Sequence, residues 1–433
     1  MTGRDLSGNL WRYQAYQVLV VAFLFVPIVV LFWEENGLDP FDVYILQGLY
    51  AVAVVLLEVP TGMVADRLGK RTSLIGAAAL LSAGMFVYAV GVGFVSFLLA
   101  EIVLAVGVSL LSGADSALLY DTLASLGREE DFRRVEGSAR SQQMVSIAIF
   151  TAIGGLVGAW SFRATLWLSA IGPALALVIA LGFVEAGTQA GAGSGNKRPS
   201  SLAESLRAYG KLIGGSVRFV RRHQLVRWHI AFLAVLGGSA TWLLWMYQPY
   251  MREVGLPVMA FGLVFAGYNL FAALASRYAH RLDERFGRTG TLVALAVLQV
   301  VPLFGMALLI SPAAILFVLG HQAVRGLSRP IIQDRVLRYT HADKRATVLS
   351  LGSLGARLFF GVTAPVIGWV TKTRTMSESL VFQGVLLIVA LGCLMWAYGR
   401  IPAKYFVVKQ SVRDKQAPNE EAPNEVPAES LEA

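Results

Sequence analysis

The sequence predicts an all-α membrane protein built from two similar halves, and three observations support this prediction. The 433-residue chain is 56% hydrophobic and only 15% charged, whereas an ordinary soluble domain has roughly 25% charged residues. Its apolar residues collect in segments of about 20, the length that an α-helix needs to cross the hydrocarbon of a bilayer. Two charged loops also occupy matching places in the two halves. Many segments of such a chain face lipid.

The apolar segments define the expected helices in order. In the first half we expect helices near 11–33, 43–64, 73–91, 94–120, 139–160 and 163–185. In the second half we expect them near 226–251, 258–280, 289–309, 311–333, 346–371 and 378–400. Twelve spanning segments result, six in each half.

The loops between these segments indicate how the chain crosses the membrane. Loops after even-numbered helices carry most of the cations, namely Arg67, Lys70, Arg71, Arg128, Arg133, Arg134, Arg281, Arg285, Arg288, Arg335, Arg338, Lys344 and Arg345. Loops after odd-numbered helices carry only Arg163, Arg252, Lys372 and Arg374, and the first of them is acidic. By the positive-inside rule both termini are cytoplasmic. The net charge of +9 therefore reflects membrane topology, and we expect no nucleic-acid binding.

Composition divides the chain into four parts. We expect an N-terminal bundle at 1–185, a cytoplasmic linker at 186–225, a C-terminal bundle at 226–400 and a disordered cytoplasmic tail at 401–433. The linker begins with a flexible Gly- and Ser-rich stretch. Apolar residues then recur at spacings of three or four, at Leu202, Leu206, Tyr209, Ile213, Val217 and Val220. This pattern predicts a basic amphipathic helix on an anionic leaflet, or alternatively a solvated linker helix.

Two short loops make the repeat visible. The first runs from Gly62 to Arg71 and contains Asp66, Arg67, Gly69 and Lys70. The second runs from His280 to Arg288. When Gly69 is aligned with Gly287, Glu284 lies opposite Asp66, Arg285 opposite Arg67 and Arg288 opposite Lys70.

The first loop resembles the signature loop of the Major Facilitator Superfamily, G-x-x-x-D-R-x-G-R-K, with Lys70 and Arg71 as its final basic pair. The second loop is a degraded copy, with His280 in place of the first Gly. The resemblance extends over residues 1–400 and implies twelve helices in two pseudo-symmetric six-helix bundles that transport a solute by alternating access. The segments LLEVPTGMVADRLGKR, SGADSALLYD and RATVLSLGSLGAR resemble a bacterial drug- or metabolite-efflux branch. That origin implies the cell inner membrane.

Ionisable residues inside the spanning segments are candidate functional groups, because such residues are costly there. Glu101 and Asp115 are 14 residues apart and face nearly the same side of one helix. They are candidates for proton coupling, although Asp115 would stay ionised if it were paired with an arginine. Glu101 stands where the family motif often has Arg, so a relay role does not carry over to it. Glu58 and His321 complete this group of candidates.

Substrate contacts are expected on four helices. His321, Arg325 and Arg329 form a stripe at steps of four, which suits an anionic substrate or standing pairs with carboxylates. Arg357 is a further cation. Cavity candidates on other helices are Trp242, Gln248, Tyr13, Gln14 and Gln17. Pro249 should kink or break its helix, Glu58 should join Asp66 and Arg67 in a gate, and Asp121 and Asp334 should cap helix ends.

No motif indicates an enzyme, a metal site or a cofactor, and no Walker A loop indicates ATP hydrolysis. We favour secondary transport, with protons driving the efflux of drugs or metabolites. One alternative is an anionic solute, bound by Arg325 and Arg329 and moved in either direction. Another is a sensor or scaffold that kept the fold. We expect a monomer in the lipid bilayer.

Overall fold

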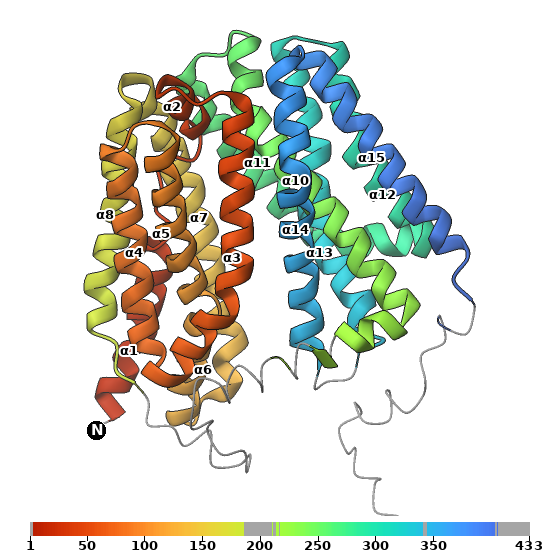
Figure 1. The fold of residues 1–433 in the computed structure, drawn as a ribbon. Helices are drawn as coiled ribbons and strands as arrows, with labels where there is room; N and C mark the ends of the chain where they lie inside the picture. The colour runs from red at the N-terminus through yellow and green to blue at the C-terminus, as the bar shows by residue number, and fades with distance from the viewer. Residues whose placement is uncertain are drawn as a thin grey trace, which may run out of the picture.

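The computed structural model describes residues 3–185, 210, 214–215, 217–340, 344–402 and 405. These residues form helices and short connections, without a β-strand among them. Two helical bundles stand side by side, one from each half of the chain (Figure 1). Ten of the described helices are long and apolar enough to cross a membrane. The chain is therefore an all-α membrane protein.

The first bundle follows the predicted order of segments. Its helices are α1 (Gly3–Leu19), α2 (Val29–Glu35), α3 (Pro40–Leu68), α4 (Lys70–Val90), α5 (Gly93–Leu111), α6 (Ala114–Ser125), α7 (Phe132–Trp160) and α8 (Phe162–Leu181), with the short 3-10 helix η1 (Glu129–Asp131) before α7. The second bundle contains α10 (Gln224–Glu253), α11 (Val258–Arg277), α12 (Ala279–Leu308), the 3-10 helix η2 (Pro312–Phe317), α13 (Val318–Leu337), α14 (Arg345–Thr373) and α15 (Met376–Gly399).

The continuous helix predicted for 11–33 is wrong, because the chain leaves helical geometry between α1 and α2. Pro27 in this break lacks a backbone N–H, and side chains of other helices bond four of the backbone groups around it. The Ser169 hydroxyl accepts hydrogen bonds from the N–H groups of Leu24 and Phe25, at 2.8 and 3.2 Å. The Gln248 amide bonds the N–H of Val30 at 2.8 Å and the carbonyl of Val26 at 2.9 Å. Side chains from other helices therefore stabilise the non-helical segment between α1 and α2.

The helix predicted for 94–120 is also divided. Gly113 has φ +82, a left-handed conformation that favours glycine, and it separates α5 from α6. Asp115 consequently lies in the first turn of α6. By contrast, α10 continues past Pro249 to Glu253, so this proline does not end its helix.

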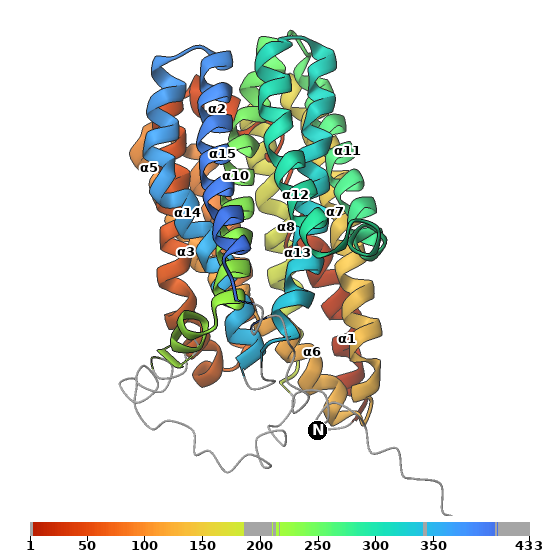
Figure 2. The ribbon, with the colours of Figure 1, turned by 90° about the vertical axis from the view of Figure 1, so that its right-hand side faces the viewer.

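The bundles meet along two pairs of helices, α3 against α14 and α7 against α11 (Figures 1 and 2). Glycines allow the second pair to approach closely. A Cβ atom at Gly155 of α7 would lie 2.5 Å from the backbone N of Gly262 on α11, and one at Gly262 would lie 2.5 Å from the carbonyl oxygen of Thr151. Most of the predicted linker and nearly all of the predicted tail lie outside the described residues. Of the predicted amphipathic helix, the structure describes residues 210, 214–215 and 217–220, which are helical.

Candidate functional site

A cavity of about 520 Å³ lies between the two bundles. Most of its wall comes from the C-terminal half, through α10, α13 and α14, and α3 supplies the part from the N-terminal half. Its apolar lining includes Leu236, Leu244, Trp245 and Phe360. Its polar lining includes Gln47, Tyr50, Thr241, Tyr247, His321, Gln322, Arg325, Ser328, Arg329, Ser353 and Arg357.

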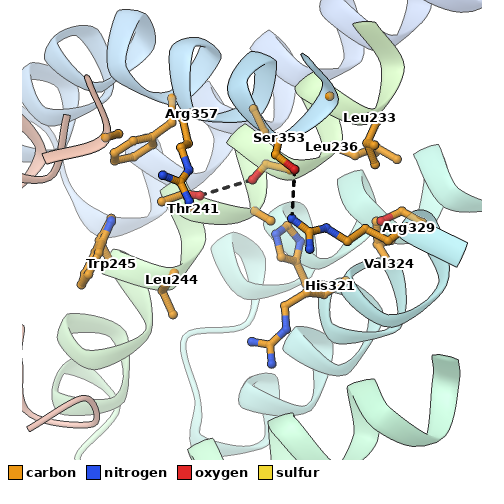
Figure 3. Close-up of a pocket in the computed structure, with 18 of the residues that line it drawn as sticks. Leu233, Leu236, Thr241, Leu244, Trp245, His321, Val324, Arg329, Ser353 and Arg357 are labelled. Carbon is orange, nitrogen blue, oxygen red and sulfur yellow. Dashed lines mark hydrogen bonds between the residues drawn. The ribbon is translucent and has the colours of Figure 1, made fainter. Parts of the chain in front are cut away.

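Three arginines give this cavity its charge. Arg325 and Arg329 come from α13 and Arg357 from α14, and Figure 3 shows Arg329, Arg357 and His321 among the side chains that line the cavity. Arg325 donates a hydrogen bond to the Asn269 side chain, and Arg329 donates to the Ser353 hydroxyl at 3.4 Å. Within the described part of the chain, none of the three forms an ion pair. No described carboxylate lines the cavity either.

His321 lies near the start of α13, one turn before Arg325. It is 2% exposed, and its Nε2 is 3.3 Å from the Gln299 amide nitrogen. Its Nδ1 has no hydrogen-bond partner among the described residues. The neighbouring Gln322 donates to the Tyr247 hydroxyl at 3.3 Å. The stripe expected from the sequence therefore faces one cavity, with its two arginines exposed to the space and its histidine buried.

Glu101 lies behind the opposite wall. Its Oε1 accepts hydrogen bonds from the Tyr88 hydroxyl, at 2.6 Å, and from the Gln47 amide. Gln47 itself lines the cavity. Glu101 is 6% exposed and has no cationic partner in the described parts of the chain.

Asp115, in contrast, belongs to a charged network in the N-terminal half. Arg140 on α7 pairs with Asp115 at 3.1 Å and with Glu136 at 3.0 Å. Gln17 donates to Asp115 at 2.6 Å, and the Tyr13 hydroxyl donates to Glu136. Arg140 and Glu136 were not among the residues predicted from the sequence. Their spacing of four residues on one helix indicates a pair, but only the fold shows that Asp115 is beside them.

The other substrate candidates lie outside the cavity lining. Trp242 is fully buried and donates from its indole to the Thr363 hydroxyl at 2.8 Å. Gln248 holds the break between α1 and α2. Tyr13 and Gln17 belong to the Arg140 network, and Gln14 is half-buried on the same helix.

The first signature loop is fastened to the ends of α6 and α8. Gly69 has φ +93, and a Cβ atom there would collide with the Glu185 carboxylate. That carboxylate accepts a hydrogen bond from the Lys70 backbone N–H at 2.7 Å. The Lys70 side chain pairs with Asp121, and Arg71 donates to the Leu181 carbonyl at 2.8 Å. Gly62, Asp66 and Arg67 lie within the last turns of α3, with Glu58 half-buried one turn before them.

The second loop is fastened differently. Arg335 pairs with Asp283 and donates to the Arg288 carbonyl at 2.9 Å. Glu284 and Arg285 are exposed near the kink of α12, where Gly287 has φ +65. Asp334 pairs with Arg338 one turn later, at 2.7 Å. We call the side of the molecule that carries both loops the basic end.

Ion pairs between the two halves lie at the other side, which we call the acidic end. Glu34 pairs with Arg252 at 2.6 Å, and Asp39 pairs with Lys372 at 2.7 Å. Each pair joins a residue of the first half to one of the second. Among the described residues no ion pair between the halves is found at the basic end.

Comparison with known proteins adds the following. The sequence model of the family described as Major Facilitator Superfamily matches residues 18–340 and 230–431. None of the curated proteins searched matches the chain. A crystal structure of the nucleoside transporter NupG superposes with a TM-score of 0.72 at 11% identity, covering 93% of this chain and 100% of that one.

Two further solved structures have the same fold. A bacterial homologue of the human lysosomal transporter Spinster, in an inward-facing and unoccupied conformation, gives a TM-score of 0.66 at 14% identity, with coverage of 91% and 96%. A POT family transporter in complex with a thioalcohol-conjugated peptide gives 0.62 at 14% identity, with coverage of 92% and 95%.

Proposed function

The chain belongs to the Major Facilitator Superfamily, and from this premise we propose that it is a secondary transporter of a small organic anion. The solute would bind in the cavity between the bundles and cross by alternating access. Repeat-built transporters hold their substrates near the midplane, at the interface between repeats. The cavity has this position, since it takes its lining from both halves.

The observation that carries the proposal is the uncompensated charge of the cavity wall. Arg325, Arg329 and Arg357 face one space without a described carboxylate. Arginine does not lose its proton in proteins, and its guanidinium suits bidentate binding of carboxylate or phosphate. The sequence left open the alternative that these arginines form permanent ion pairs with carboxylates. In the described part of the chain, none of the three arginines has such a partner. An anionic solute would neutralise this wall.

Proton-driven efflux of cationic drugs is the second candidate function. Of its four candidates for proton coupling, Asp115 is paired with Arg140. The aromatic wall of α10 still supports it, through Trp245 and Tyr247. A lipophilic cation would nevertheless meet three like charges, so the anion is favoured.

We place the basic end, with both termini, on the cytoplasmic side of the inner membrane, because cationic loops stay inside. The conformation described here, joined at the acidic end by two ion pairs, would then face the cytoplasm. We propose that one copy of the chain is sufficient for transport, since the cavity is built from a single chain.

Transport by purified protein in proteoliposomes tests the proposal. Uptake of radiolabelled benzoate, succinate and glycerol 3-phosphate is compared with that of tetraphenylphosphonium. Uptake of at least one anion, lost in Arg325→Gln and Arg329→Gln but kept in Arg374→Gln, supports the anion. Transport of tetraphenylphosphonium alone would overturn it in favour of drug efflux, and no transport of any of them would also count against it.

A further inference from the structure

Two carboxylates of the described chain are buried, and only one has a cation. Asp115 is 3% exposed and pairs with Arg140. Glu101 is 6% exposed, and in the described structure it has only two neutral partners, Tyr88 and Gln47. An isolated buried carboxylate is costly to keep ionised, and binding a proton removes that cost. The two acids are therefore in different chemical situations.

Among the described residues, no cation forms an ion pair with Glu101. Helices α3, α4 and α6 pack against α5. The groups that face Glu101 are Tyr88 on α4 and Gln47 on α3, with Tyr50 one turn further along α3. The acids of α6 are already neutralised, Asp115 by Arg140 and Asp121 by Lys70. Arg357 of α14 lies close enough to act electrostatically on Tyr50, as Glu101 does. Within the described chain Arg357 forms no ion pair with Glu101, so a proton can neutralise this acid.

Gln47 connects this acid to the solute cavity. It is 5% exposed, lines the cavity and donates its amide N–H to Glu101. An ionised carboxylate only accepts hydrogen bonds, whereas a protonated one also donates. A side-chain amide has a donor end and an acceptor end. When Glu101 takes up a proton, the Gln47 carbonyl becomes the better partner, and a turn of the amide presents its NH₂ group to the cavity.

We propose that Glu101 is a proton-binding site behind the cavity wall, and that Gln47 transmits its protonation state to the cavity by turning its side-chain amide. One proton enters from cavity water, binds a carboxylate oxygen of Glu101, and leaves by the same atom. The proton site does not depend on the proposed function. The effect of the proton on solute binding, however, rests on the proposed transport of an anion. An NH₂ group facing the cavity adds a donor for an anion, so proton and anion would favour each other's binding.

Infrared difference spectroscopy of the purified full chain, without any organic solute, tests the proton site. The pH is lowered stepwise from about 9 to about 6, a range in which exposed carboxylates stay almost fully ionised. The C=O stretching band of a protonated carboxylic acid should grow in the wild type. It should be lost in Glu101→Gln and kept in the matched control Asp115→Asn. Glu101→Asp should retain a titrating band, which separates loss of the site from loss of folding.

The same titration tests Gln47. In Gln47→Leu the ionised form of Glu101 loses a donor, and the midpoint should move to higher pH by about one unit. A band that survives in Glu101→Gln would overturn the proton site. An unchanged midpoint in Gln47→Leu would overturn the coupling. Because no solute is present, failure here leaves the anion proposal intact, and failure of anion transport leaves this proton site intact.

Discussion

Arg140 decides what Asp115 can do. An aspartate in a membrane helix is a natural candidate for a proton carrier, and the sequence analysis treated it so. In the structure, however, the Arg140 guanidinium pairs with Asp115 at 3.1 Å. Glu101, less favoured at first, lacks such a partner in the described structure and lies one side chain from the cavity. The role of a charged residue in a membrane helix therefore depends on whether it has an ion-pair partner, and only the tertiary structure shows that partner.

At the residue scale, Arg329 should bind the charged group of the solute. We expect Arg329→Gln to weaken binding of a transported anion about 10- to 100-fold, because charge-assisted hydrogen bonds contribute roughly 1.5–3 kcal/mol. Arg374→Gln is the matched control, since Arg374 is exposed at the end of α14. Titration of the anion against detergent-solubilised protein gives the affinities, and equal affinities for both variants would contradict the assignment.

Gly69 should be intolerant of a side chain. Gly69→Ala needs a positive-φ backbone conformation that is essentially limited to glycine, at a cost of roughly 1–3 kcal/mol, and its Cβ collides with Glu185. Gly137→Ala, at an exposed position with open space, is the control. Transport rates of the two variants at equal reconstituted amounts provide the measurement. Full transport by Gly69→Ala would show that the conformation of this loop is not needed for gating.

At the element scale, apolar length predicted where helices lie but not where they break. Residues 20–28 read as part of one apolar segment, and their departure from helix depends on Ser169 and Gln248 from other helices. Gln248 was expected in the cavity because it is polar and deep. Its amide is instead used by the backbone of Val26 and Val30. A single sequence does not show which buried polar side chains hydrogen-bond the backbone and which are available to contact a solute.

The contact between α7 and α11 gives a prediction for an element. Gly262→Ala places a Cβ atom against backbone of α7, with its nearest contact at 2.5 Å, so the helices must separate. Overpacking of this kind typically destabilises by about 1–3 kcal/mol. Gly267→Ala on the same helix meets nothing within 4 Å and should be neutral. Thermal unfolding in detergent measures the difference, and identical midpoints would show that the helices separate easily.

At the scale of the whole molecule, sequence symmetry predicted the two bundles correctly but not the asymmetry of the site. The loops at Gly69 and Gly287 repeat in sequence, yet Lys70 pairs with Asp121 in one half while Arg335 pairs with Asp283 in the other. The cavity lining is likewise unequal, since only Gln47, Tyr50 and Ala51 come from the N-terminal half. Symmetry fixes where the halves meet, whereas the side chains that line the cavity differ between the halves.

Alternating access requires the acidic end to open, and its ion pairs should control that step. Partial burial alone would raise the pKa of Asp39, but hydrogen bonds from Lys372 and from the Asp42 backbone lower it overall. A lowered pKa means that the closed state gains stability from Asp39 above the ordinary aspartate pKa of about 3.9. That contribution disappears as the pH falls through the lowered pKa of the closed state. Acid should therefore loosen this end, while changes near neutral pH should leave the pair intact.

Charge reversal separates this pair from other effects of acid. Asp39→Lys should repel Lys372 and shift molecules toward an open acidic end, and adding Lys372→Asp should restore closure because the pair is re-formed with opposite polarity. Spin labels on Glu35→Cys and Arg374→Cys, both exposed positions in opposite halves, report the separation in a Cys393→Ser background. A longer distance in the single reversal and the wild-type distance in the double one are expected. If the double reversal stayed open, the pair would not be what closes this end, and the Glu34–Arg252 contact at 2.6 Å would be the next to reverse, since it joins the same two halves.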